Sequence, residues 1–211
     1  MINYTISFEK PHRHYVDFEL TTSTNQQDRI NFQLACWRPG RYELGNFSQN
    51  IRNWEAYDEN NQPLPFRKIT KDLWQVDTNT ANKVRISYSF YANQLDAGGC
   101  YLDEYQLYLN PVHCMFYIKG RIDEDYTIAL KLPKNYRIAT SMQKTGNTIQ
   151  VKGYDLLAES PIICSDTLKH DSYEVDGILF HLWFQSKFSI LSKKFSLNIF
   201  SFMISVVSMN T

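Results

Sequence analysis

Strict alternation of apolar and polar residues is the feature that most limits what this chain can fold into. In Tyr15–Leu20, the apolar side chains Val16, Phe18 and Leu20 fall on one face, and the residues between them fall on the other. A period of two over six to eight residues is typical of a strand with one buried face, and such strands belong to antiparallel sheets whose outer face meets water. The same pattern recurs in Arg29–Leu34, Lys83–Phe90 and Tyr126–Leu132.

Turn signals separate these runs and shorter ones. The Asp176-Gly177 pair between two alternating segments predicts a two-residue hairpin with positive φ angles. Helical periodicity is weak before the C-terminal stretch, and we expect only one or two turns of helix at 46–51 and at 154–158. The sequence therefore predicts an all-β fold, built as an antiparallel sandwich or saddle of sheets with little helix. Further short strands are predicted at 4–8, 54–57, 74–77, 106–109, 148–151 and 173–184.

Charge and composition argue against nucleic-acid binding and divide the chain into a domain and a tail. The chain has 211 residues, and its 22 Lys and Arg residues balance its 22 Asp and Glu residues. A nucleic-acid reader would need a basic face or domain, so we expect no nucleic-acid partner. All the acidic residues lie at or before Asp176, whereas Lys187, Lys193 and Lys194 lie near the end. We therefore expect a β domain over residues 1–185 and an atypical tail, rich in Ser, Phe and Lys, over 186–211.

The tail and the N-terminus bear on location. The apolar part of the tail, 195–209, is short for a spanning helix and is interrupted by polar residues, so we expect no membrane partner. The N-terminus lacks the basic and apolar regions of a signal peptide, which favours a cytoplasmic location. We interpret the tail as non-native sequence, or a truncated continuation of the domain. The alternative is a genuine C-terminal strand or a membrane-surface segment.

Cysteine and histidine spacing gives little support for a metal site. The four cysteines, at positions 36, 100, 114 and 164, form no C-x-x-C pair and are expected to be reduced. His12 and His14 have the i, i+2 spacing that would place two imidazoles on one face of a strand, but zinc needs further ligands. The remaining candidates are His113 and His170, each beside a Cys or Asp. We expect surface histidines, no catalytic residue and no metal ligand.

Two segments combine turn residues with aromatic side chains. The first runs from Ala35 to Phe47, where Pro39-Gly40 predicts a type II turn flanked by Trp37 and Tyr42. The second runs from Ala97 to Pro111, where a glycine pair precedes an aromatic-rich extended run. Either segment could be ordinary turn and strand, and either could line a cleft.

These segments also carry a resemblance to a known family. The motif Trp37-x-Pro39-Gly40-x-Tyr42, with Asn46-Phe47 and Asn50-Ile51 after it, resembles the N-terminal domain of the glycyl aminopeptidase family of zinc metallopeptidases. Members of that family join an N-terminal β domain to a thermolysin-like domain and a PDZ domain. Further matches stand in the family's order along the chain. Ahead of this motif they are Pro11 and His14-Tyr15, and after it they are Lys71 to Val76 including Trp74, Tyr101-Leu102-Asp103, Asn110-Pro111, Tyr154-Asp155 and Glu159 to Ile162.

The resemblance implies a domain that supports the catalytic domain and walls one side of its substrate cleft. The family's zinc is held by an H-E-x-x-H helix and a downstream glutamate, and this chain contains no such motif. We therefore expect no cofactor here, no peptidase activity from this chain alone, and a catalytic domain as its partner. The peptide substrate would be met only indirectly. The resemblance places Tyr101, Asp103 and Asn110 near that substrate.

Two other functions remain open. A stand-alone binding module could stack a peptide or a carbohydrate on exposed tryptophans, for which the candidates are Trp37, Trp54, Trp74 and Trp183. An enzyme could use a metal bound by His12 and His14.

Overall fold

The computed structural model describes residues 1–38, 40, 43–185 and, for the backbone only, 203–207. Its largest unit is a sheet of seven strands. All neighbouring strands in it run antiparallel except β1 and β11, which pair in parallel. In spatial order the strands are β13 (Gln143–Thr145), β14 (Thr148–Val151), β11 (Tyr126–Leu130), β1 (Ile2–Ser7), β2 (Tyr15–Ser23), β7 (Lys83–Tyr91) and β4 (Ile51–Tyr57).

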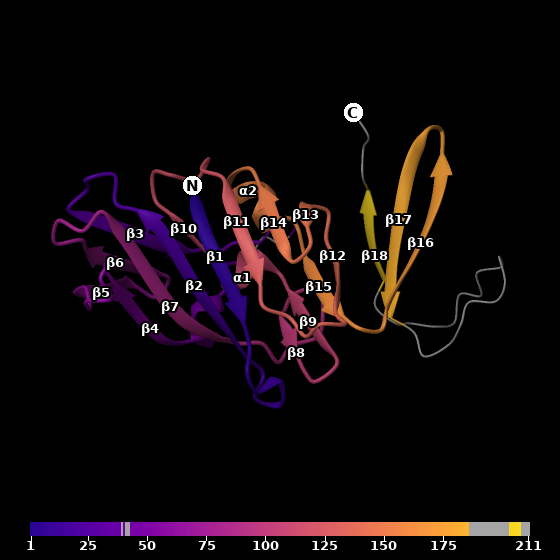
Figure 1. The fold of residues 1–211 in the computed structure, drawn as a ribbon, viewed down its shortest axis with the longest axis horizontal. Helices are drawn as coiled ribbons and strands as arrows, with labels where there is room; N and C mark the ends of the chain where they lie inside the picture. The colour runs from indigo at the N-terminus through magenta and orange to yellow at the C-terminus, as the bar shows by residue number, and fades with distance from the viewer. Residues whose placement is uncertain (39, 41–42, 186–202, 208–211) are drawn as a thin grey trace.

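Three smaller sheets accompany it in the described part of the chain (Figure 1). One contains β10 (Phe116–Ile118), β3 (Arg29–Leu34), β6 (Leu73–Asp77) and β5 (Phe66–Thr70). A second contains β12 (Arg137–Ala139), β15 (Ile162–Ser165), β9 (Gln106–Leu109) and β8 (Tyr101–Leu102). The third contains β16 (Leu168–Val175), β17 (Ile178–Gln185) and β18 (Met203–Val207), and Figure 1 shows it at one end of the molecule. The expected all-β fold is confirmed.

The alternating faces build one core between the sheets. Val16, Phe18 and Leu20 on β2 are buried, and so are the alternate residues of β3 in the second sheet. Each such side chain removed from water contributes about 2 kcal/mol, so the shared face holds the two sheets together. The hairpin predicted at Asp176-Gly177 is confirmed, since both residues have positive φ and join β16 to β17.

Helix is confined to short segments. The turns expected near 46–51 and 154–158 are present as η2 (Phe47–Asn50) and α2 (Gly153–Ala158). Two further segments, η1 (Pro11–Arg13) and α1 (Pro111–Cys114), were not expected. Each begins at a proline, whose fixed φ suits the first position of a helix and whose missing N–H costs nothing there. In the described part of the chain, no helix is both long and apolar enough to cross a membrane.

Three buried tyrosines fix the segment between α1 and β10. The Tyr88 hydroxyl donates to the carbonyl of Cys114 at 2.6 Å, and the Tyr154 hydroxyl donates to that of Met115 at 3.0 Å. The Tyr4 hydroxyl accepts from the amide of Phe116 at 2.7 Å and donates to its carbonyl at 3.2 Å. Burial raises the pKa of all three phenols, so they stay protonated donors.

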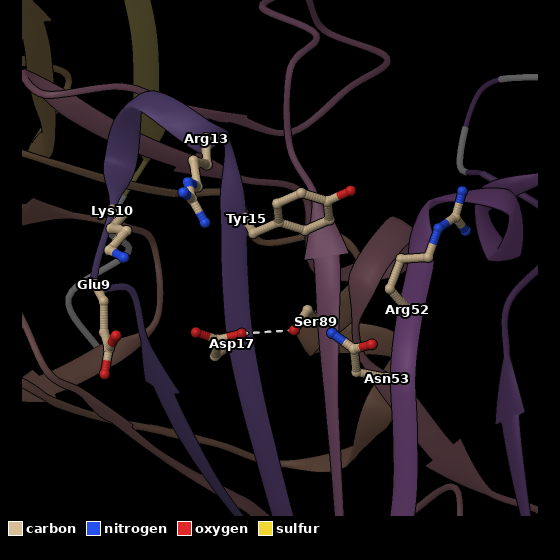
Figure 2. A pocket seen from close by; sticks show the side chains of 8 residues that line it. All are labelled: Glu9, Lys10, Arg13, Tyr15, Asp17, Arg52, Asn53 and Ser89. Carbon is tan, nitrogen blue, oxygen red and sulfur yellow. Dashed lines mark hydrogen bonds between the residues drawn. The ribbon is translucent and has the colours of Figure 1, made fainter.

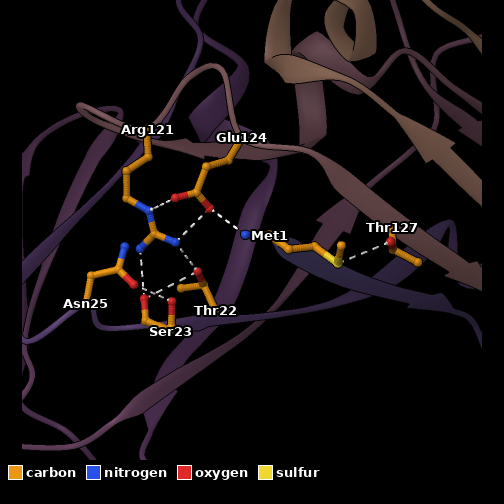
Figure 3. Close-up of polar contacts among 7 residues, drawn as sticks. All are labelled: Met1, Thr22, Ser23, Asn25, Arg121, Glu124 and Thr127. Atoms are coloured by element: carbon orange, nitrogen blue, oxygen red, sulfur yellow. Dashed lines mark hydrogen bonds and ion pairs between the residues drawn. The ribbon is translucent and has the colours of Figure 1, made fainter.

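A buried arginine in the loop before β11 ties that loop to the end of β2 (Figure 3). Arg121 is 8% exposed and donates to both carboxylate oxygens of Glu124, at 2.6 and 2.8 Å. It also donates to the Thr22 hydroxyl and to the Ser23 carbonyl. The amine of Met1 lies 2.9 Å from the same carboxylate. The guanidinium therefore has partners on several sides, which is how a charge can be buried at an acceptable cost.

Candidate functional site

The two segments with turn and aromatic residues meet at one cavity of about 210 Å³. Residues 45–50 form one side and residues 90–100 form another, and His113 on α1 completes the wall. The sequence left open whether either segment lines a cleft, and both line this one. The lining residues are Gly45, Asn46, Phe47, Gln49, Asn50, Phe90, Tyr91, Gln94, Gly98, Gly99, Cys100 and His113.

The loop that carries Cys100 is held by the side chain of Asn110. Its amide nitrogen donates to the carbonyl of Gly99 at 2.7 Å, to that of Ala97 at 3.3 Å and to the Tyr108 hydroxyl at 3.0 Å. Asn110 is only 7% exposed. A Cβ on Gly99 would lie 2.4 Å from the backbone oxygen of Gln94, so this position needs glycine.

His113 is buried against Phe47. The ring centroids lie 4.0 Å apart, and His113 is 2% exposed. A Cβ on Gly45 would clash with the Phe47 ring, so the glycine allows this ring to pack directly against the backbone at position 45. Among the described residues, the Nε2 atom of His113 has no hydrogen-bond partner. An unpaired buried polar atom is costly and often marks a place of chemical use.

Cys100 and Cys114 lie beside this imidazole. The Cys100 sulfur accepts the backbone N–H of Asn110 at 3.3 Å, and the Cys114 thiol donates to the Asn110 carbonyl at 3.4 Å. Burial acts to raise the pKa of Cys100, but the neighbouring Cys114 and His113 side chains outweigh it and lower that pKa to about 6. Burial and the neighbouring Cys100 sulfur raise the pKa of Cys114 well above its usual value. Cys100 is therefore the member of the pair that ionises first.

The residues predicted to lie near a substrate occupy the neighbouring β8–β9 hairpin. Tyr101 is half-buried, and burial together with the Asp103 carboxylate raises its pKa. The Asp103 carboxylate accepts the backbone N–H groups of Tyr105 and Gln106, at 2.8 and 2.9 Å, and so closes the hairpin. Tyr101 lies on β8 and Asp103 lies in the turn after it, whereas Asn110 directly follows β9 and is buried.

The resemblance motif is only partly described. Pro39 and Tyr42 lie outside the described residues. Gly40 has a φ of 73°, as the predicted turn requires. Trp37 is 37% exposed and meets Tyr154 edge-on. Trp74 is buried and packs against Phe116 and a second tryptophan in the core.

The tryptophans do not form a common binding platform. Trp54, like Trp74, belongs to the core and cannot stack on a ligand. Trp183 is covered by the Arg137 guanidinium at 5.0 Å and by the ring of His170 at 4.5 Å. Of the four tryptophans that the sequence offered for stacking a ligand, Trp37 is the most exposed, at 37%.

The expected geometry of His12 and His14 was wrong. Pro11–Arg13 forms a 3₁₀ turn, η1, and His14 follows it with a φ of 60°, so the two imidazoles do not share a strand face. The proline at the first position starts that turn, and its closure overrides the alternating pattern. The His14 ring instead bonds the carbonyl of Leu102 at 2.6 Å. In the described ranges, no three His, Cys, Asp or Glu residues are grouped so that they could hold a metal ion.

A larger hollow of about 480 Å³ lies on the outer face of the large sheet, and charged groups of both signs line it (Figure 2). Lys10 and Arg13 reach it from the segment before β2, and Arg52 reaches it from β4 on the opposite side. Asp17 accepts a hydrogen bond from Ser89 on its floor at 2.7 Å. Mixed charges around an open hollow are typical of a solvated surface, and the smaller cavity has the more specific chemistry.

Sequence reasoning did not select Cys100 as a site residue, and it noted His113 only as a possible ligand beside Cys114. No sequence pattern marks this pair, because its proximity depends on the three-dimensional fold. Cys100 and His113 come together because Asn110, between them in the chain, bonds the loop that carries Cys100 and directly precedes α1, which carries His113.

Comparison with known proteins agrees with the resemblance. None of the curated proteins compared matches the chain. A crystal structure of an aminopeptidase N family protein from Idiomarina loihiensis is similar, with a TM-score of 0.78 and 26% sequence identity. The similarity covers 85% of this chain but only 31% of that protein. The family model of the peptidase M61 N-terminal domain matches residues 3–166. Since this match spans most of the chain, the chain belongs to the peptidase M61 N-terminal domain family.

Proposed function

We propose that this chain is a non-catalytic domain that packs against the catalytic domain of an M61-type peptidase and walls its substrate cleft. The observation that carries the proposal is the family match over residues 3–166, together with the 31% coverage of the similar aminopeptidase-family protein. Most of that protein has no counterpart in this chain. The proposed domain comprises residues 1–185, and zinc would be bound only by the catalytic domain.

The β8–β9 hairpin is the part of the surface that we assign to the substrate cleft. Tyr101 and Asp103 lie at its partly exposed end, where they could meet a peptide. Asn110 would affect the substrate only indirectly, because its side-chain amide already donates to the Gly99 carbonyl in the loop before β8 and to the Tyr108 hydroxyl. The peptide is thus an indirect partner. The four cysteines are free, which fits the proposed cytoplasmic location.

The test is an aminopeptidase assay on the full chain, alone and with a separately produced thermolysin-like domain of an M61 peptidase. We expect no turnover of glycyl or alanyl substrates by the chain alone with added zinc, and a stoichiometric complex with the catalytic domain. Chelator-sensitive hydrolysis by the chain alone would contradict the proposal, and so would the absence of a complex.

The cleft assignment is tested in the same complex. Tyr101→Ala and Asp103→Asn should raise KM while leaving the affinity between the domains unchanged. Tyr173→Ala, on the exposed β16–β17 hairpin, is the matched aromatic control. Equal KM values for all of these variants would remove Tyr101 and Asp103 from the cleft.

A further inference from the structure

We propose that Cys100 and Cys114 form a reactive thiol pair at the wall of the 210 Å³ cavity, where small disulfides convert them to an intramolecular disulfide. Cys100 and His113 both line this cavity. A space of that size corresponds to roughly seven water molecules, enough for a compact disulfide such as bis(2-hydroxyethyl) disulfide. This modification site is independent of the proposed role beside a catalytic domain.

The two thiols are immediate neighbours. Both bond to the same atom, the Asn110 carbonyl oxygen, with the Cys100 sulfur at 3.7 Å and the Cys114 sulfur at 3.4 Å. Each thiol also shifts the pKa of the other. The two cysteines are fourteen positions apart in sequence and are brought together by β9 and α1, so a disulfide would join residues that already share one hydrogen-bond partner.

His113 supplies the basic group that a reactive thiol needs. Its Nε2 atom has no partner among the described residues, and its ring is held by Phe47. The titratable groups that face Cys100 are His113, Cys114 and Tyr108. Of these, only the imidazole can carry a positive charge, so it can balance the thiolate when the thiol proton leaves. The lowered pKa of Cys100 agrees with this arrangement.

The other two cysteines lack this setting. Cys164 is buried in β15, and burial raises its pKa far above the usual value. Cys36 is half-buried and does not line the cavity. Exposure alone would make Cys36 react first, whereas the geometry of the cavity selects Cys100.

The reaction takes two exchange steps, and the small disulfide is the oxidant. The Cys100 thiolate attacks one sulfur of the disulfide, forms a mixed disulfide and releases one small thiolate. Cys114 then attacks the Cys100 sulfur, and its proton passes to the second departing thiolate. The chain loses two thiol hydrogens and gains one S–S bond, while the oxidant is reduced to two small thiols.

The experiment incubates the native full chain with bis(2-hydroxyethyl) disulfide and follows the products by mass spectrometry of peptides. We expect the Cys100–Cys114 disulfide to accumulate before any adduct on Cys36 or Cys164. Cys114→Ser should stop the reaction at a mixed disulfide on Cys100. Cys100→Ser should leave Cys114 unmodified.

The role of His113 has its own readout, the pH profile of the first step. The rate for the native chain should rise with a midpoint near pH 6. In His113→Asn the midpoint should move to a higher pH, and the rate at pH 7 should fall several-fold, because the thiolate becomes scarcer. His12→Asn, at an exposed histidine that does not line the cavity, is the matched control and should keep the native midpoint.

Three results would overturn the proposal. The first is an adduct on Cys36 while Cys100 and Cys114 stay reduced in the folded chain. The second is reaction of Cys100 only in denaturant, and the third is an unchanged pH midpoint in His113→Asn. If that variant does not fold, the order of cysteine modification in the native chain still decides the matter.

Discussion

Replacing Asn110 by alanine should destabilise the domain strongly, although the side chain was expected from sequence to serve a substrate rather than the fold. The substitution removes the donor to the Gly99 carbonyl at 2.7 Å and to the Tyr108 hydroxyl at 3.0 Å, and a weaker third bond to Ala97. Losing the bond to Tyr108 costs about 1 kcal/mol, and leaving the buried Gly99 carbonyl without this donor costs about 1–3 kcal/mol. The total loss should be about 2–4 kcal/mol.

Urea unfolding followed by tryptophan fluorescence measures this loss, because Trp54 and Trp74 are buried in the core. A loss of this size should lower Tm by roughly 4–16 °C for a domain of this length. Asn110→Asp keeps the shape but turns an oxygen toward the carbonyls, and it should cost at least as much. Asn135→Ala, at an exposed turn, is the control and should change the free energy of unfolding by less than about 0.5 kcal/mol. If Asn110→Ala matched that control, the loop would not depend on the amide.

Two further predictions concern an ion pair and a close backbone approach. The hydrogen bond from Arg121, aided by the Met1 amine, lowers the pKa of Glu124 to about 2, so the pair stabilises the fold fully above about pH 4.5 and loses this effect as the pH falls toward 2. Between pH 5 and 2, the native chain should therefore lose about 2 kcal/mol more than Glu124→Gln in acid titrations of unfolding, and parallel curves would contradict this. Gly99→Ala should cost about 1–3 kcal/mol in urea unfolding, because the new Cβ meets the Gln94 oxygen at 2.4 Å. Unchanged stability would mean that the loop has another conformation available.

The alternating pattern predicts the larger part of the fold because each buried face is a local property of the sequence. Val84, Ile86, Tyr88 and Phe90 on β7 show it clearly, since all four are buried as expected. The parallel pairing of β1 with β11 could not be predicted, because the pattern gives the face of a strand and not its neighbour. Short strands such as β8 and β12 contain too few residues to show a period at all.

The candidate site was predictable only in outline. The Gly98-Gly99 pair and the Asn110-Pro111 step marked the right segment. The contact between Phe47 and His113 depends on two elements 66 positions apart in the chain, and no local pattern indicates it. The turn around His12 shows the opposite case, in which proline geometry overrides a spacing that looked meaningful.

The three tyrosine hydroxyls on residues 114–116 couple distant parts of the chain to one short backbone segment. β1, β7 and α2 each supply one of these hydroxyls, so the segment loses a partner whenever any of the three elements detaches. Detaching β1 frees the amide of Phe116, whereas detaching β7 or α2 frees the carbonyl of Cys114 or of Met115, so hydrogen exchange at the Phe116 amide reports the opening of β1. The β16–β17 hairpin supplies none of these hydroxyls, so its amides can exchange while this segment keeps all three partners.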